Sequence, residues 1–165
     1  MDEGSEKLAL LDRSEYLYLR QITEPRDNSL RIVVQEAIGN RAKAPAGVQG
    51  IPKAILSGAA PIESTGTCKT FVLHWPRYVA YLVTEEAVGS CGVRGDEVFI
   101  GRFFRTYEKS HLLDHIARDT GGHFKPFRHY KIICLNHLID VVSTFAPEIE
   151  VIEGSGPKPS RHPVQ

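Results

Sequence analysis

The sequence predicts an α+β domain, built on a mostly antiparallel sheet of about six strands with two short helices packed on it. Strands are predicted where apolar residues recur at every second position, as they do at Leu30, Ile32 and Val34 and again at Phe71, Leu73 and Trp75. A helix is predicted over 110–119, where apolar side chains gather on one side of a helical projection.

The first half of the domain is predicted to contain two hairpins separated by a long loop. Residues 15–22 are rich in aromatic residues and form the first strand, and a turn at 25–28 joins it to the strand that begins at Leu30. Residues 39–66 contain five glycines and three prolines, which predicts a long irregular loop. The strand 71–75 then turns at Pro76 and pairs with a strand over 79–83 as the second hairpin.

The second half is predicted to alternate strands and helices. A glycine-rich connection at 89–96 leads to a strand over 98–107, in which Gly101 indicates a bulge or a close backbone approach. Ser110 caps the first helix, which ends near Asp119 with its polar face outward. A strand over 129–135 follows, and Asn136 caps a second helix over 137–144. Pro147 stops that helix, so 148–152 is expected to be an edge strand.

The domain organisation follows from these elements. Residues 1–14 are an N-terminal extension, 15–153 are a single α+β domain, and the proline-containing residues 154–165 are expected to be a disordered tail. The chain of 165 residues has 20 basic and 20 acidic side chains, so its net charge gives no support to nucleic-acid binding.

The beginning of the chain is acidic and does not resemble a secretory leader, and no apolar run approaches the roughly 18 residues of a membrane span. Three widely spaced cysteines favour free thiols in a reducing compartment. We therefore expect a cytoplasmic protein that does not bind membranes.

The first candidate site is a metal centre at His111, His115 and His123. Two histidines four residues apart on a helix can bind one zinc ion, and His123 lies beyond the glycine turn that follows the helix. Leu112 stands where a zinc protease would have its glutamate base, which excludes that enzyme class. Another metal-dependent hydrolase, a structural metal site, or a polar helix face without a metal remain open.

Two further clusters carry reactive or charged side chains. Cys134, with Asn136, His137 and Asp140 nearby, is compatible with thiol chemistry, but its apolar neighbours favour core packing. An aromatic and basic surface suits an acidic protein partner or nucleic-acid bases, and ordinary cross-strand ion pairs explain it equally well; its basic members are Arg77, Arg102, Arg105 and Lys109. The signatures of nucleotide-driven motors, dinucleotide oxidoreductases and serine hydrolases are absent from the sequence.

The last three-fifths of the chain carries a resemblance to known proteins. The segments 98–114 and 129–143 together resemble a family of small uncharacterised bacterial cytoplasmic proteins. That resemblance implies a bacterial source and a shared α+β fold. It implies no activity and no site residues.

Three functions are compatible with the sequence. The first is a non-enzymatic protein-binding module in bacterial defence, toxin neutralisation or regulation, because the core pattern is clear and no catalytic set is complete. The second is a hydrolase that uses zinc or another divalent metal at the histidine cluster, acting for example on a phosphoester. The third is a small-ligand binding domain in which Trp75 and Tyr81 line an apolar pocket beneath the 39–66 loop.

Overall fold

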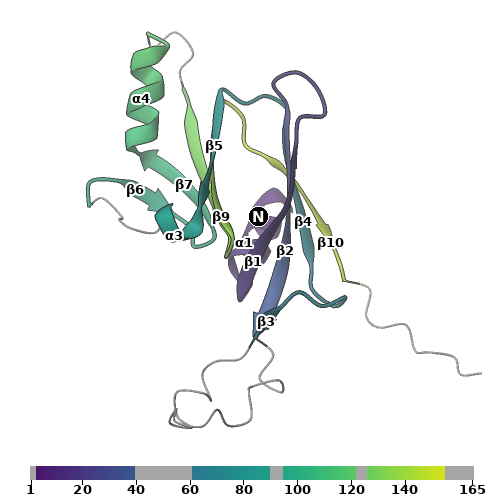
Figure 1. Cartoon of the computed structure of the whole chain (residues 1–165). Helices are drawn as coiled ribbons and strands as arrows, with labels where there is room; N and C mark the ends of the chain where they lie inside the picture. Colours follow the sequence, from purple (N-terminus) through teal and green to yellow (C-terminus); the bar gives the residue numbers. More distant parts are fainter. Residues whose placement is uncertain (1–2, 40–60, 90–94, 122–125, 155–165) are drawn as a thin grey trace, which may run out of the picture.

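The chain folds as two antiparallel β-sheets that face each other, as seen in the computed structural model (Figure 1). The structure describes residues 3–39, 61–89, 95–121 and 126–154. Within these residues the elements are α1 (Glu3–Asp12), β1 (Tyr16–Thr23), β2 (Leu30–Gly39), β3 (Ile62–Glu63), β4 (Thr70–Trp75), β5 (Ala80–Glu85), α3 (Glu86–Gly89), β6 (Val98–Ile100), β7 (Phe104–Lys109), α4 (His111–Asp119), β8 (Arg128–Ile133), β9 (His137–Ser143) and β10 (Glu148–Ile152). The predicted α+β class is confirmed, with more strands than expected.

The first sheet has the strand order β1-β2-β4-β10, and the short β3 pairs with the end of β2. The predicted first hairpin is confirmed, because β1 and β2 are antiparallel neighbours. Leu30, Ile32 and Val34 are fully buried on one face of β2, as their alternation predicts. The predicted edge strand is also confirmed as β10, which pairs only with β4 among the described strands.

The second sheet has the order β5-β9-β8-β7-β6. Its inner face carries Phe104, Tyr130, Ile132, Ile139 and Val141, which belong to the same buried cluster as the inner face of the first sheet. Trp75 of β4 contacts Tyr130 of β8, with ring centroids 5.8 Å apart. The two sheets therefore share one hydrophobic core, whose burial is the main favourable term in folding.

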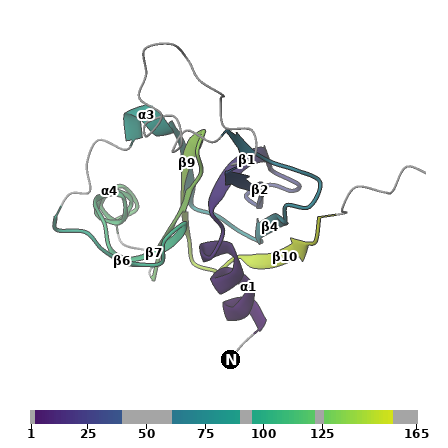
Figure 2. The same ribbon diagram turned by 90° about the horizontal axis from the view of Figure 1, so that it is seen from below.

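Helix α1 lies at one open side of the two sheets, between the β7 and β10 regions (Figure 2). Leu11 is fully buried in the shared core. The Asp12 carboxylate accepts hydrogen bonds from the backbone N–H groups of Arg102, Phe103 and Phe104, at 3.1, 2.8 and 2.8 Å. Sequence reasoning treated residues 1–14 as an extension and did not predict this helix.

The predicted second hairpin, 71–75 with 79–83, is wrong. Strand β4 pairs with β2 and β10 in the first sheet, whereas β5 pairs with β9 in the second. The connection through Pro76 passes from one sheet to the other, as the backbone shows: the N–H of Tyr78 donates to Asn28 of the β1–β2 turn, and the N–H of Val79 donates to Val142 of β9. Two strands adjacent in sequence thus lie in different sheets.

The predicted continuous strand 98–107 is two strands, β6 and β7, which pair antiparallel with each other. Gly101 lies in the turn between them with φ of +94°, a conformation that side-chain-bearing residues rarely adopt. A Cβ at Gly101 would lie 2.0 Å from the carbonyl oxygen of Phe104. Glycine at this position therefore marks a tight turn and close backbone approach, not a bulge within one strand.

The predicted second helix over 137–144 is also wrong, because this segment is strand β9. Six of its seven residues are buried, on both faces of the sheet. It contains the β-branched residues Ile139, Val141 and Val142, which suit a doubly covered strand. The Asn136 side chain does not cap a helix; it accepts from the Leu19 N–H at 2.9 Å and donates to the Leu19 carbonyl at 3.1 Å.

The helix predicted from Ser110 is confirmed as α4. The Ser110 side chain accepts a hydrogen bond from the N–H of Leu113 at 3.1 Å, which satisfies one of the free donors of the first turn. The apolar side is half-buried and the polar side is exposed, as the helical projection predicts. Of the predicted 39–66 loop, residues 40–60 lie outside the described residues, as do 155–165 of the predicted tail.

Candidate functional site

Strand β5 is an edge of the second sheet, and its apolar side chains are unusually exposed. Among the described strands it pairs only with β9. Tyr81, Leu82 and Val83, at its centre, are 36, 52 and 38% exposed. An antiparallel edge strand also directs the N–H and C=O of every second residue away from its neighbour. Such an edge can pair with a strand from another chain.

The other sheet edges are protected in ways that β5 is not. Strand β10 carries exposed Glu148 and Glu150, and β6 is only three residues long. Strand β1 is bonded to the β8–β9 turn through Asn136 and through the N–H of Leu135, which donates to the Leu17 carbonyl at 2.8 Å. Charge, shortness and covering contacts are common devices that prevent edge pairing. Strand β5 has no charged residue before Glu85.

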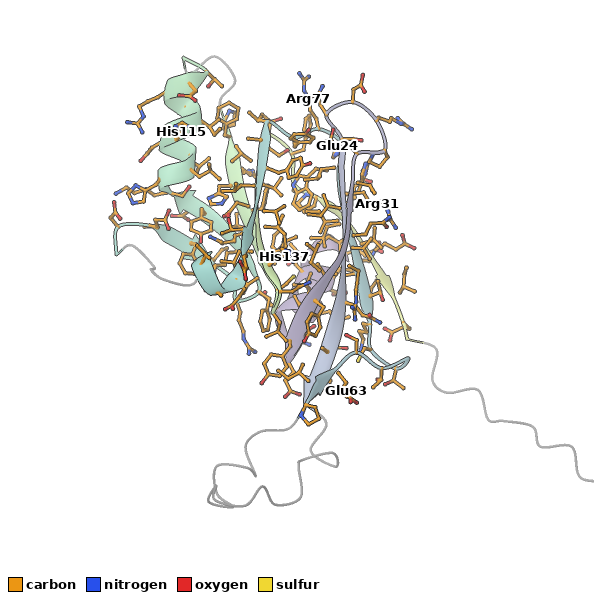
Figure 3. All side chains as sticks on the ribbon, viewed as in Figure 1. Glu24, Arg31, Glu63, Arg77, His115 and His137 are labelled. Atoms are coloured by element: carbon orange, nitrogen blue, oxygen red, sulfur yellow. The ribbon has the colours of Figure 1, made fainter. Side chains whose placement is uncertain are left out.

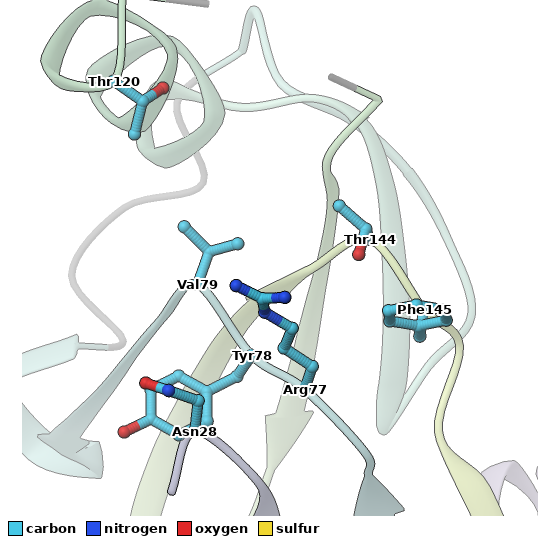
Figure 4. A pocket seen from close by; sticks show the side chains of 7 residues that line it. All are labelled: Asn28, Arg77, Tyr78, Val79, Thr120, Thr144 and Phe145. Carbon is cyan, nitrogen blue, oxygen red and sulfur yellow. The ribbon is translucent and has the colours of Figure 1, made fainter. Parts of the chain in front are cut away.

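A cleft of about 460 Å³ lies beside the beginning of β5, at the end of the molecule that carries the β1–β2 turn (Figures 3 and 4). Its walls come from the β1–β2 turn, the connection between the sheets, the end of α4 and the segment after β9, with the lining residues Asn28, Arg77, Tyr78, Val79, Thr120, Thr144 and Phe145. The Arg77 side chain extends across this cleft (Figure 4). No ion pair involving it is found in the part of the chain that the structure describes. The cleft thus offers a guanidinium group to an anionic ligand.

Two tyrosines and Glu24 adjoin this cleft. The rings of Tyr78 and Tyr81 contact edge to face, with centroids 5.1 Å apart. The Tyr81 hydroxyl donates to Glu24 Oε1 at 3.2 Å. Partial burial, and after it the nearby Glu24 carboxylate, raise the pKa of both phenols, so both remain neutral donors in neutral solution. The Glu24 carboxylate therefore accepts hydrogen bonds from the tyrosines.

The predicted metal ligands are held by separate carboxylates. His111 Nε2 lies 3.0 Å from Asp96 Oδ1, and His115 Nε2 lies 3.5 Å from Asp119 Oδ2. His123 lies outside the described residues. Within the described residues, no group of three histidine, cysteine, aspartate or glutamate side chains is arranged to hold a metal ion. The metal site stays a prediction.

Sequence reasoning missed a buried polar chain on the outer face of the second sheet, next to α4. His129 Nε2 donates to Asp140 Oδ1 at 2.8 Å, and His129 Nδ1 shares a hydrogen bond of 2.8 Å with Ser110 Oγ. Lys131 Nζ lies 3.2 Å from the same carboxylate oxygen, and the Tyr107 ring stacks on His129 at a centroid distance of 4.2 Å. These contacts depend on the pairing of β8 with β9. The incorrect prediction of a helix over 137–144 therefore prevented their recognition from the sequence.

The buried polar chain contains a serine, a histidine and an aspartate, but these three residues are not arranged for nucleophilic catalysis. Ser110 bonds the Nδ1 nitrogen and Asp140 the Nε2 nitrogen, the reverse of the arrangement in serine proteases. Ser110 is 1% exposed, and its hydroxyl oxygen also caps α4. The buried polar chain is therefore a structural network that joins α4, β8 and β9.

The cysteine cluster is likewise structural. Cys134 is 2% exposed in the shared core, as the packing interpretation predicts. Burial raises the pKa of its thiol to about 12, so the thiolate required of a nucleophile is scarce at neutral pH. Asn136 is bonded to the Leu19 backbone, and Asp140 belongs to the buried polar chain.

The four predicted basic residues do not form one surface around the cleft. Arg77 lines the cleft, and none of the other three does. Arg102 lies over the Phe103 ring at 4.4 Å, and Arg105 over the Phe99 ring at 4.3 Å. Lys109 ends β7, immediately before the cap of α4. Arg77 is the member that the structure places in a cavity.

The two residues predicted to line an apolar pocket lie in different surroundings. Trp75 is fully buried in the shared core, whereas Tyr81 is partly exposed on β5. Neither lines the cleft, which Tyr78 reaches instead. Residues 40–60 of the overlying loop lie outside the described residues.

Comparison with known proteins assigns this chain to no family. No family model, no curated protein and no solved structure matches it. The bacterial resemblance, and with it a bacterial setting, stays a prediction. None of the helices in the described part of the chain is both long and apolar enough to cross a membrane.

Proposed function

We propose that this protein is a non-enzymatic, cytoplasmic protein-binding module that adds an extended segment of another polypeptide to β5. The observation that carries the proposal is an edge strand with three adjacent exposed apolar residues and no charge at its centre. Peptide recognition by strand addition uses main-chain hydrogen bonds for affinity and side-chain sites for specificity. The free thiols of Cys68 and Cys134 support the reducing location.

The cleft supplies the specificity in this proposal. It begins at Val79, one residue before β5, so a strand bound along β5 ends beside it. Arg77 favours a carboxylate at that end of the bound segment. The preferred segment is therefore an extended one with alternating apolar residues and an acidic residue near the cleft.

Selection from a display library of random decapeptides tests the proposal. We expect enriched peptides to alternate apolar residues and to protect the backbone amides of 79–85 from hydrogen exchange when bound. Leu82→Lys should weaken their binding at least about tenfold, because it places a solvated charge in the centre of the new interface.

Ile100→Lys is the matched control, because Ile100 is an apolar residue of the other edge, β6, and is 70% exposed. It should leave peptide affinity unchanged. The proposal fails if no peptide family is enriched, or if enriched peptides protect a different part of the chain.

A further inference from the structure

We infer that a second copy of this chain occupies β5, so that two β5 strands pair antiparallel about a two-fold axis at Leu82. This inference rests on the proposed function of β5 and names the partner. It follows from the order of residues along the strand, which is complementary to itself.

The apolar residues at the centre of β5 pair favourably with the same residues of a second, antiparallel β5. With Leu82 opposite Leu82 of the second copy, Tyr81 lies opposite Val83, and Val83 opposite Tyr81. Tyr81 and Val83 share the inner face of the sheet, because their partners on β9 are the core residues Val141 and Ile139. Pairs of an aromatic and a β-branched residue across antiparallel strands are favourable. The two-fold axis forms each such pair twice.

The charges at the two ends of the strand are complementary in the same register. Glu85 is three residues beyond Leu82, and Val79 is three residues before it. Glu85 of the second copy therefore lies opposite Val79 along the strand. Val79 and Arg77 line one cleft, so this register brings the incoming carboxylate to the end of the strand that carries the guanidinium group. Glu85 is exposed, and no ion pair involving it is found among the described residues.

The other sheet edges are less suitable for pairing with a second copy. The exposed edge of β10 carries two glutamates, which repel a second copy of themselves. The β6 edge offers only three residues. Pairing at β5 also covers an edge that the described residues of one copy leave unpaired, and it joins the second sheets of both copies into one continuous sheet.

Sedimentation velocity of the full chain, from micromolar to millimolar concentration, tests this inference. A single six-residue edge is a small interface, so we expect a reversible dimer with a micromolar dissociation constant. Hydrogen exchange of the 79–85 amides should slow as the concentration rises. Leu82→Lys places two like charges at the axis and should raise the dissociation constant at least about tenfold, whereas Ile100→Lys should not.

A charge exchange locates the register. Arg77→Glu and Glu85→Arg should each weaken the dimer, and the double variant should regain most of the lost affinity because it restores both opposite-charge pairs. A dimer insensitive to Leu82→Lys, or a double variant weaker than both single variants, overturns the register about Leu82. A chain that stays monomeric at every concentration, yet selects β5-binding peptides, overturns the second copy as partner and leaves the proposed function standing. A monomer that selects no peptide overturns both.

Discussion

Replacing Asp140 with alanine tests the buried polar chain. The substitution removes the acceptor of His129 Nε2–H and the carboxylate partner of Lys131. His129 is only 3% exposed, so its donor cannot reach water, and an unsatisfied buried donor costs about 1–3 kcal/mol. The Lys131 side chain is 22% exposed and can turn to solvent, so the loss of its ion pair adds only about 0.5–1 kcal/mol to the cost. We expect Asp140→Ala to lower the free energy of unfolding by about 1.5–4 kcal/mol.

Urea unfolding at neutral pH measures this loss, provided that the m-value is unchanged. For a chain of this length the same loss lowers the melting temperature by about 5–15 °C. Asp119→Ala is the matched control, because its pair with His115 is 3.5 Å long and both side chains are well exposed; it should cost less than about 0.5 kcal/mol.

A double-mutant cycle then separates the hydrogen bond from other effects of the substitution. His129→Leu combined with Asp140→Ala removes donor and acceptor together, so the pair should cost less than the sum of the single variants. A loss below about 1 kcal/mol for Asp140→Ala, or strict additivity in the cycle, refutes the structural role of the chain.

Three further predictions concern single positions. Gly101→Ala should lower the free energy of unfolding by at least about 2 kcal/mol, since its φ is +94° and a Cβ would meet a backbone oxygen; Gly95→Ala, where a Cβ meets nothing, should be close to neutral by the same urea assay. Asn136→Ala should cost about 1–3 kcal/mol because two hydrogen bonds to the β1 backbone are lost, and amide exchange should speed up in β1. The thiol pKa of Cys134 rises from 9.0 to about 12 on folding, so above pH 9 only the unfolded chain loses this proton. Stability relative to Cys134→Ala should therefore fall by about 1.4 kcal/mol per pH unit from pH 9 upwards, and a parallel pH dependence of the two proteins contradicts it.

Local patterns in the sequence predicted those elements whose two faces differ. Strand β2 alternates because one face is buried, and α4 begins at a serine whose side chain caps the first turn. Strand β9 was predicted wrongly because both of its faces are covered, which removes the alternation. The apolar pairs on either side of Asp140 fit a short helix as well as a strand covered on both faces, and periodicity does not separate the two.

The pairing between strands was harder to predict from the sequence than the strands themselves. Hairpins were predicted from proximity in sequence, which succeeded for β1 and β2 and failed after Trp75. The hydrogen bonds that redirect the chain involve Asn28 and Val142, both remote in sequence from the turn. The buried polar chain was inaccessible for the same reason, since it requires the register of β8 on β9. Arg77 was singled out from its residue type, but its cleft depends on three further segments that are distant in sequence.

The passage between the two sheets creates the candidate site. Had β4 and β5 formed a hairpin, β5 would extend the first sheet and its Tyr81–Val83 centre would be placed against different neighbours. Because the chain crosses at Pro76, β5 instead becomes the last strand of the second sheet, and the crossing segment forms one wall of the cleft. The exposed apolar edge and the guanidinium group beside it therefore have a common structural origin. A partner that pairs with β5 necessarily brings one end of its strand to Arg77, and this proximity makes acidic character at that end the expected basis of recognition.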